Sequence, residues 1–182
     1  HLCITNPTLV AGIHQAYAAA GAEVVETNSF GANRTKLQRH GLADQLEAIN
    51  RAAVRLARGA AGDGGWVAGS VGPVLKSGQV FLDNQAADLA AIFREQLGAL
   101  AGEGVDCFML ETFTHIQEAR LAAREARRFD LPVFVSMTVG VDGETAGVDE
   151  AHALRKKRLE RGRTDRRRRR RRRLRGQHVQ PH

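Results

Sequence analysis

The sequence predicts an α/β fold that forms part of a (β/α)8 barrel, from about its second to its fifth strand. Four short apolar runs alternate with stretches whose apolar residues recur every three or four positions, which is typical of parallel strands joined by amphipathic helices. Each apolar run becomes polar at its C-terminal end, where (β/α)8 barrels bind their ligands. The alternative is an open doubly wound sheet, but no Gly-x-Gly-x-x-Gly motif follows a strand, which disfavours a dinucleotide-binding version.

A hydrophobic content of 43% and 19 glycines are typical of a globular, loop-rich protein, and 182 residues suit one domain or part of a larger one. The longest apolar runs are too short to cross a bilayer, so we expect no membrane partner. The N-terminus lacks both the features of a signal peptide and an initiator Met, so we expect the chain to begin inside a longer protein. Two cysteines do not make a disulfide framework, which predicts a reducing, cytoplasmic location.

The predicted helix nearest the N-terminus begins at Asn6 and Pro7, a capping residue followed by proline in the first turn, and ends at Gly21. Its apolar residues fall on one face at helical spacing: Leu9, Val10, Ile13, Tyr17 and Ala20. His14 on this helix is expected to pack or to face solvent, because the sequence supplies no catalytic partner for it.

The first predicted strand, at residues 23–27, is apolar at its start and polar at its end. The polar end continues through Thr27, Asn28 and Ser29, which would present two hydroxyl groups and an amide to a ligand. The alternative is a strand that runs into an ordinary polar loop. The recurrence of the same pattern in three later strands favours the ligand site.

The middle of the chain predicts two further helices and one strand. A short helical turn at residues 37–41 precedes a long helix at residues 42–60, and a strand at residues 66–73 precedes a helix at residues 86–102. The predicted buried stripe of the first long helix consists of Leu46, Ile49, Ala53, Leu56 and Ala60. The apolar face of the second consists of Leu89, Ile92, Phe93, Leu97 and Leu100.

The third predicted strand, at residues 105–110, ends in an apolar run that is typical of a strand buried on both faces. Cys107 in this run is expected to be a small core residue. Glu111 follows directly, and a carboxylate at the C-terminal end of a buried strand is well placed to meet the ammonium group of a ligand. The alternative for Glu111 is a helix-capping or loop acid. A helix at residues 116–128 and a strand at residues 131–140 follow.

Several segments in combination resemble the homocysteine S-methyltransferase domain, over about residues 5–147. These segments are Pro7 to His14 with Tyr17, residues 20–33, Leu42, residues 49–54, residues 56–58, residues 68–73, residues 103–106 and residues 110–112. That domain serves cobalamin-dependent methionine synthase, betaine–homocysteine methyltransferase and bacterial fusions with methylenetetrahydrofolate reductase.

The resemblance implies a zinc-dependent methyltransferase in which zinc binds the homocysteine thiolate and a methyl donor alkylates the sulfur to give methionine. A metal keeps such a thiolate deprotonated near neutral pH. The resemblance further implies that Glu111 binds the homocysteine amino group and that Thr27, Asn28 and Ser29 line the amino-acid pocket. Methyltetrahydrofolate acting through cobalamin on other domains, betaine and S-methylmethionine all stay open as the donor.

The sequence departs from the family pattern at the metal site. The family's Asp-Gly motif of the first strand would lie before residue 1. The family's Asn-Cys and Gly-Gly-Cys-Cys motifs do not occur, and Cys3 and Cys107 match none of the cysteine positions. A tetrahedral zinc site cannot be built from these two cysteines. We therefore assign no catalytic residue and no metal ligand, and we expect the chain alone to be inactive.

The C-terminal part differs in charge from the rest of the chain, whose net charge is +7. Residues 1–150 contain 12 Lys or Arg and 18 Asp or Glu, whereas residues 151–182 contain 15 and 2, including eight consecutive arginines from Arg166 to Arg173. We therefore expect a barrel domain at residues 1–148 and a disordered basic tail at residues 149–182.

Two interpretations of the tail remain. A genuine basic tail would bind nucleic acid or another polyanion through phosphate contacts, without base stacking because no aromatic residue interleaves it. The chain would then be a non-catalytic binding protein with an α/β scaffold. We favour a shifted reading frame in GC-rich DNA, because the arginine-rich stretch replaces the next expected strand and helix.

Overall fold

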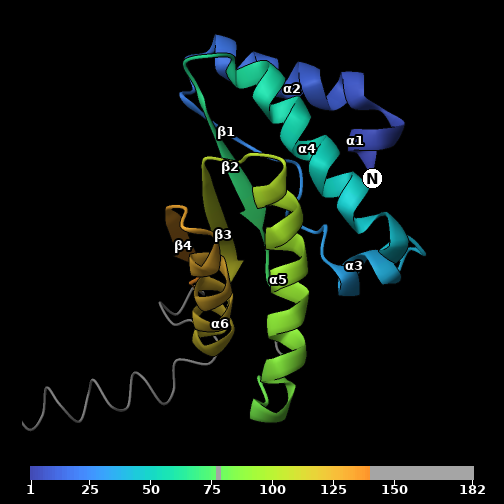
Figure 1. Cartoon of the computed structure of the whole chain (residues 1–182), viewed down its shortest axis with the longest axis vertical. Coiled ribbons are helices and arrows are strands. Elements are labelled where there is room, and N and C mark those ends of the chain that lie inside the picture. Colours follow the sequence, from blue (N-terminus) through green and yellow to red (C-terminus); the bar gives the residue numbers. More distant parts are fainter. Residues whose placement is uncertain (77–78, 140–182) are drawn as a thin grey trace, which may run out of the picture. The chain divides into compact units, whose positions relative to one another are not determined.

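The computed structural model describes residues 1–76 and 79–139, which form a parallel four-stranded sheet with helices (Figure 1). The strands lie in the order β1-β2-β3-β4, and each pair of neighbours is parallel. Their bounds are Val24–Glu26 for β1, Trp66–Val71 for β2, Cys107–Phe113 for β3 and Val133–Met137 for β4. The order of the described strands does not reverse, as it would at the switch point of a doubly wound sheet, so the arrangement agrees with the predicted barrel.

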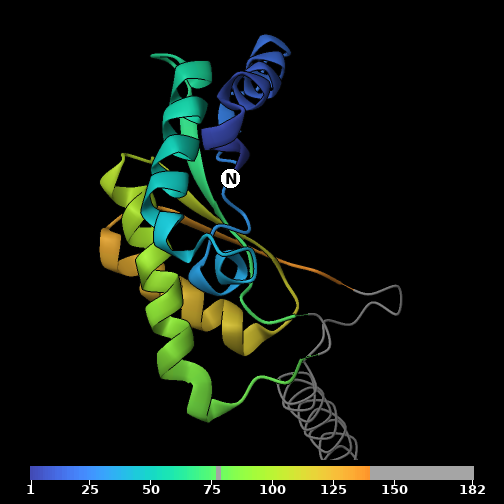
Figure 2. The same ribbon diagram turned by 90° about the vertical axis from the view of Figure 1, so that its right-hand side faces the viewer.

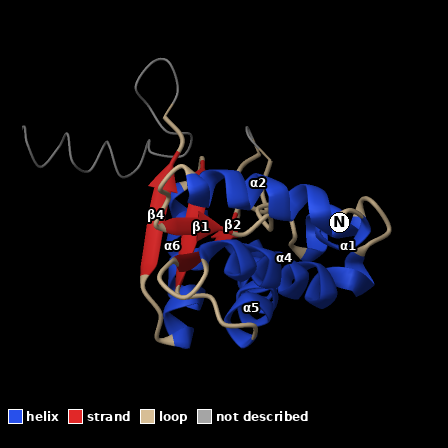
Figure 3. Ribbon diagram, turned by 90° about the horizontal axis from the view of Figure 1, so that it is seen from above, coloured by secondary structure: helices blue, strands red, loops and turns tan. Residues whose placement is uncertain are grey.

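The helices that connect successive strands pack on one face of the sheet. α4 (Leu46–Ala61) follows β1, α5 (Ala86–Gly102) follows β2 and α6 (Ile116–Ala126) follows β3. Figure 3 shows this layer from above, and α5 and α6 run side by side in Figures 1 and 2. The other helical elements of the described residues are α1 (Leu2–Thr5), α2 (Pro7–Ala19), α3 (Arg34–Gln38), η1 (Ala43–Gln45), η2 (Asp83–Gln85) and η3 (Arg127–Phe129).

The side chains of each strand alternate between the helix layer and the opposite face of the sheet, which we call the inner face. Val25, Val71 and Leu110 belong to the core that the helices cover. Because successive strand residues point to opposite sides, the residues next to them, Glu26, Ser70 and Glu111, lie on the inner face. The fold thus separates an apolar helix-side face from a polar group near the strand ends.

Aromatic side chains fill the space between the sheet and the helices. Phe93 on α5 and both Phe108 and Phe113 on β3 are 0% exposed. The ring centroids of Phe93 and Phe113 lie 6.0 Å apart. Burial of each such side chain stabilises the fold by about 1.5–3 kcal/mol, so β3 and α5 form the centre of the core.

β3 contains one extra residue near its C-terminal end. Between two successive pairings β3 advances three residues, from Leu110 to Phe113, while β4 advances two. Within this bulge Thr112 has φ 64°, a left-handed conformation that is costly for a β-branched residue. The bulge allows both Leu110 and Phe113 to face the core while Glu111 stays on the inner face.

The end of the third strand is the main correction to the predicted elements. The prediction ended this strand at residue 110, whereas β3 continues to Phe113, so Glu111 lies inside the strand. The reason is the bulge, which lets β3 keep pairing with β4 beyond the apolar run. In α4 the predicted stripe is buried at Leu46, Ile49 and Ala53 but only partly buried toward its end, at Leu56 and Ala60.

The apolar face predicted for the helix nearest the N-terminus, which is α2 in the structure, is largely exposed. α2 begins at Pro7 as predicted, with the Asn6 side chain accepting a hydrogen bond from the backbone of Leu9. However, Ile13 and Tyr17 are 51% and 67% exposed, because in the described residues they line an open groove and not the core.

The predicted basic tail and the end of the last predicted strand lie outside the described residues. Within those residues, no helix has both the length and the apolar character needed to cross a bilayer.

Replacing Gly69 with alanine is expected to destabilise the fold by about 1–3 kcal/mol, because an added methyl group overpacks the core. A Cβ on Gly69 would lie 3.3 Å from both Leu100 and Phe108, which are fully buried. Gly59 on α4 is the matched control, since nothing lies within 4 Å of its Cβ position, and Gly59→Ala should stabilise the helix by up to about 1 kcal/mol. Urea unfolding measures both, and equal effects would contradict the packing described here.

Candidate functional site

Three polar side chains from neighbouring strands lie on the inner face near the carboxyl ends of β1, β2 and β3, namely Glu26, Ser70 and Glu111. The Ser70 hydroxyl donates a hydrogen bond to Oε1 of Glu111. Glu26 ends β1 on the same face, where the charge of Glu111 contributes to a raised pKa of the Glu26 carboxyl group. The carboxyl group singled out in the sequence, that of Glu111, therefore lies at the ligand edge of the sheet, together with a second acid that the sequence analysis did not select.

The environment of Glu26 favours its neutral form. Partial burial raises the pKa of the Glu26 carboxyl group, and the charge and hydrogen bond of Glu111 raise it further. A carboxyl group that is partly buried and near a second negative charge keeps its proton to a higher pH than an isolated acid does.

Replacing Glu26 with glutamine is expected to stabilise the protein more at about pH 8 than at about pH 4. A carboxyl group whose pKa is raised by folding favours the folded state below its unfolded pKa, and this contribution is lost as the pH rises through the raised value. Glutamine cannot ionise, so the variant avoids that loss. Thermal unfolding across this pH range measures the difference, and a difference independent of pH would contradict the shifted pKa.

Thr27 and Ser29 are 3% and 1% exposed and bond to one another and to β2. The hydroxyl oxygens of Thr27 and Ser29 lie 2.6 Å apart, Ser29 Oγ donates to the backbone oxygen of Ser70 at 2.7 Å, and the Ser70 amide donates to Thr27 Oγ1 at 3.0 Å. These bonds fix the end of β1 against β2. Contact of either hydroxyl with a substrate stays a prediction.

Asn28, between those two residues, is exposed beside an open groove. The Cys3 thiol donates to the backbone oxygen of Asn28 at 3.6 Å, and Asn28 Nδ2 lies 3.7 Å from the Cys3 sulfur. The groove has a volume of about 590 Å³ and lies between α2 and β1, and Glu26 is one of its lining residues. His14 also lines it and is buried, as the packing interpretation expected.

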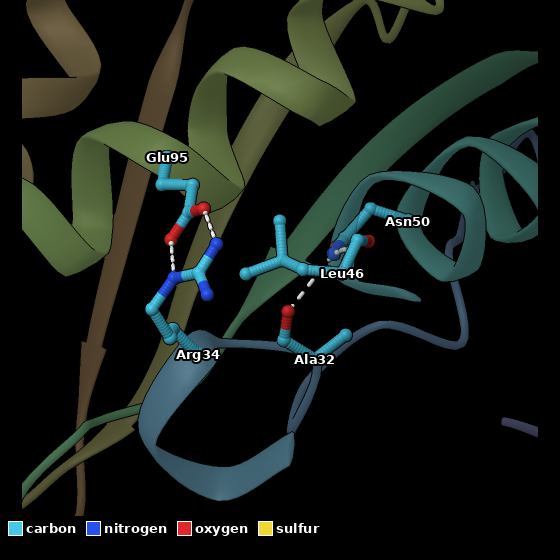
Figure 4. Close-up of polar contacts among 5 residues, drawn as sticks. All are labelled: Ala32, Arg34, Leu46, Asn50 and Glu95. Atoms are coloured by element: carbon cyan, nitrogen blue, oxygen red, sulfur yellow. Dashed lines mark hydrogen bonds and ion pairs between the residues drawn. The ribbon is translucent and has the colours of Figure 1, made fainter. Parts of the chain in front are cut away.

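Buried amide side chains from two helices hold the loop that carries Asn28. Gln96 on α5 is 0% exposed and donates to the backbone oxygen of Ser29 at 2.7 Å. Asn50 on α4 is also 0% exposed, and its Nδ2 donates to the backbone oxygens of Ala32 and Leu46, both at 2.8 Å (Figure 4). The loop position is therefore set by bonds in the protein interior.

An ion pair at the surface adds to this attachment. Arg34 at the start of α3 binds Glu95 on α5 through two hydrogen bonds, one from Nε to Oε2 at 2.7 Å (Figure 4). Both side chains are partly exposed, so solvent screens the pair and it contributes little to stability. The buried amides are the stronger determinants of the loop.

Sequence reasoning missed Glu26, Ser70 and Gln96. For Glu26 a usable signal existed, because the strict alternation of a strand places residues 24 and 26 on the face opposite Val25. For Ser70 the same alternation applies along β2. Nothing in the sequence marked Gln96, since a single polar residue in an amphipathic helix is ordinarily solvent-facing.

The described residues do not fit a zinc site. Cys3 contacts Asn28, and burial raises the pKa of the Cys3 thiol, which favours its neutral form. Burial likewise raises the pKa of Cys107, with further contributions from Asp106 and Glu26. Within residues 1–76 and 79–139, no three His, Cys, Asp or Glu side chains gather closely enough to hold a metal ion. Cys107 is buried in β3, as the core interpretation predicted.

The fold and the position of these side chains define part of a (β/α)8 barrel whose polar groups gather at the carboxyl edge of its strands. The profile of the family described as "Homocysteine S-methyltransferase" matches residues 1–159. The chain belongs to the homocysteine S-methyltransferase family. The predicted family is thereby confirmed, whereas the domain boundary near residue 148 stays a prediction.

Curated relatives and a solved structure agree with this assignment. The chain is 33% identical over 145 residues to S-methylmethionine–homocysteine S-methyltransferase BHMT2 of Rattus norvegicus, covering 80% of this chain and 38% of that protein. It is 31% identical over 151 residues to methionine synthase of Mycobacterium tuberculosis, covering 76% of this chain and 13% of that protein. The metallated form of the homocysteine methyltransferase MmuM from Escherichia coli matches with a TM-score of 0.70 and 26% identity, covering 84% of this chain and 60% of that one.

The chain thus spans well under half the length of the curated relatives named above. The similarity to the E. coli enzyme confirms the predicted partial barrel. It places the four described strands within a fold that a longer chain of this family completes.

Proposed function

We propose that this chain forms the part of a homocysteine S-methyltransferase that binds the amino-acid portion of homocysteine. The observation that carries the proposal is the Glu111 carboxyl group on the inner face, oriented by the Ser70 hydroxyl. An ionised carboxylate accepts strong, charge-assisted hydrogen bonds from an ammonium group. The position at the carboxyl edge of parallel strands is where barrels of this kind place their substrates.

The names of two relatives support homocysteine, the methyl acceptor, as the substrate bound by this part of the protein. One relative is named for S-methylmethionine as donor and another, from Mus musculus and 29% identical over 149 residues, for betaine. Both names include homocysteine as the acceptor. Because the donors differ and the acceptor does not, the stretch that this chain shares with both fits the acceptor site best.

Within this site we assign different tasks to the three residues of the loop after β1. Asn28 is exposed beside Glu26 and is placed to contact the substrate. Thr27 and Ser29 are buried and keep Asn28 in position through their bonds to β2. We therefore propose that Thr27 and Ser29 position Asn28 and do not contact the substrate themselves.

For the whole protein we propose methyl transfer to homocysteine with a zinc ion. Cobalamin and methyltetrahydrofolate are part of the same proposal. Because the described residues do not fit a metal, we derive no catalytic step from them. The inactivity of the 182-residue chain alone and its cytoplasmic location stay predictions. The polyanion-binding alternative is not favoured, since the family match extends over residues 1–159.

Chemical-shift mapping tests the proposed function. L-Homocysteine, kept reduced, is added to the ¹⁵N-labelled 182-residue chain, and the backbone amide shifts are followed. We expect the largest changes at the carboxyl ends of β1, β2 and β3, around Glu26, Ser70 and Glu111. An absence of changes, or changes confined to the helix layer, would show that the site lies elsewhere.

A further inference from the structure

We propose that the two open edges of the sheet are an interface for a second copy of this chain, in which β4 of each copy enters the apolar groove between α2 and β1 of the other. The two four-stranded sheets then close into one eight-stranded barrel with a two-fold axis. This inference rests on the sheet edges and the groove, and it does not depend on homocysteine binding.

The groove lies where a further strand would fit. In residues 1–76 and 79–139, β1 pairs with β2 on one side and its other edge is open. α2 packs against α4, and on its groove side Leu9, Ile13 and Tyr17 form a row at every fourth position. These side chains are 48%, 51% and 67% exposed. A helix of a parallel barrel presents such an apolar row to the strand beneath it.

β4 carries the matching features at the opposite edge of the sheet. Its residues, Val133–Met137, include neither a charged residue nor a proline, which are the usual protection of an edge strand. Val135 lies on the helix side of the sheet together with Val133 and Met137, yet it is 46% exposed. In the described part of the chain, α2 therefore lacks a strand beneath it and β4 lacks a second helix above it.

The inner face of the sheet also has apolar side chains that need a cover. Val24, Trp66 and Phe134 point to this face by strand alternation, and they are 47%, 60% and 55% exposed. They lie toward the amino ends of their strands, away from Ser70 and Glu111. A barrel of eight parallel strands is just wide enough for its interior to be filled by such side chains. Closure by a second copy would bury the inner face and both edges together.

The described edges favour a second copy as the partner. A two-fold axis makes the two contacts equivalent, because β4 of each copy meets the groove of the other, so one complementary pair of surfaces is used twice. All neighbouring strands of the sheet are parallel, and β4 would pair with β1 of the other copy in the same sense. Since β4 is uncharged, the contact removes no charge from water at that edge.

Sedimentation equilibrium of the 182-residue chain at high salt tests the association, because salt screens the arginine-rich segment and leaves apolar contacts intact. We expect a species of twice the monomer mass. Ile13→Lys and Val135→Glu should each raise the dissociation constant at least about 100-fold, since each places an unpaired charge in an apolar contact that occurs twice. Val80→Lys is the matched control, because Val80 is 69% exposed and belongs to neither surface, and it should leave the dissociation constant unchanged.

Mixing the two variants separates docking from a folding defect. An equimolar mixture of Ile13→Lys and Val135→Glu should recover dimers, because the lysine in the groove of one copy meets the glutamate on β4 of the other and the second contact is unmodified. A monomeric unmodified chain at all concentrations would overturn the inference. So would dimers that neither substitution weakens, equal weakening by Val80→Lys, or no recovery on mixing.

Discussion

Replacing Glu111 with glutamine is expected to weaken binding of L-homocysteine by about 10- to 100-fold, the value of one hydrogen bond to a charged group. The amide keeps an oxygen that can accept from Ser70, so the fold should change little. What is lost is the negative charge that the ammonium group needs. Isothermal titration calorimetry gives the affinity, and thermal unfolding gives the stability of the same sample.

The matched control for this substitution is Glu47→Gln on α4, because the Glu47 side chain is 67% exposed and lies in the helix layer. Its affinity for homocysteine should equal that of the unmodified chain. Ser70→Ala should fall between the two, since it removes only the bond that orients Glu111. Equal affinities for Glu111→Gln and Glu47→Gln would refute the assignment of Glu111.

Replacing Glu118 with alanine is expected to destabilise the protein by about 2–5 kcal/mol, because it leaves two buried amide groups without an acceptor. Glu118 on α6 is 0% exposed, and its Oε1 accepts from the backbone amides of Val74 at 2.6 Å and Leu75 at 3.0 Å. These amides belong to the chain that leaves β2 just beyond Ser70. Glu118 therefore attaches the start of the loop after β2 to the core.

The conservative variant Glu118→Gln separates the hydrogen bonds from the charge. Burial raises the pKa of Glu118, although the two backbone amides, His115 and Lys36 lower it. Both amides donate to the same oxygen, Oε1. Glutamine keeps that oxygen and should cost far less than alanine in urea unfolding. Since the pKa is raised, Glu118→Gln should also gain relative to the unmodified chain as the pH rises. A cost for glutamine equal to that for alanine would contradict this account.

The layers of the fold follow from periodicity in the sequence. Buried stripes on α4 and α5 repeat every three or four residues because only one side of each helix meets the sheet. The strands could be predicted from short apolar runs in the sequence, because the helix layer covers their side chains. The bulge at Thr112 was not, because a threonine gives no signal for a left-handed backbone, which its neighbours impose.

The site was predicted in part, for physical reasons that differ from residue to residue. Glu111 was identified because a carboxyl group after an apolar run is unusual enough to be noticed. Glu26 was overlooked because it precedes a more conspicuous row of hydroxyl and amide residues, and two of those, Thr27 and Ser29, turned out to be buried. Which polar residues face a ligand depends on strand alternation and on cross-strand bonds, and only the first of these can be read from a sequence.

The central claim is that this chain holds the homocysteine amino-acid site at Glu111, on the inner face near the carboxyl ends of the strands. Its most direct test compares L-homocysteine with 4-mercaptobutanoic acid, which differs by the amino group alone, for binding to the unmodified 182-residue chain by calorimetry. The account predicts that homocysteine binds more tightly by about 10-fold or more, and that Glu111→Gln removes this preference. Equal affinity for the two ligands, or no binding of homocysteine, would contradict it.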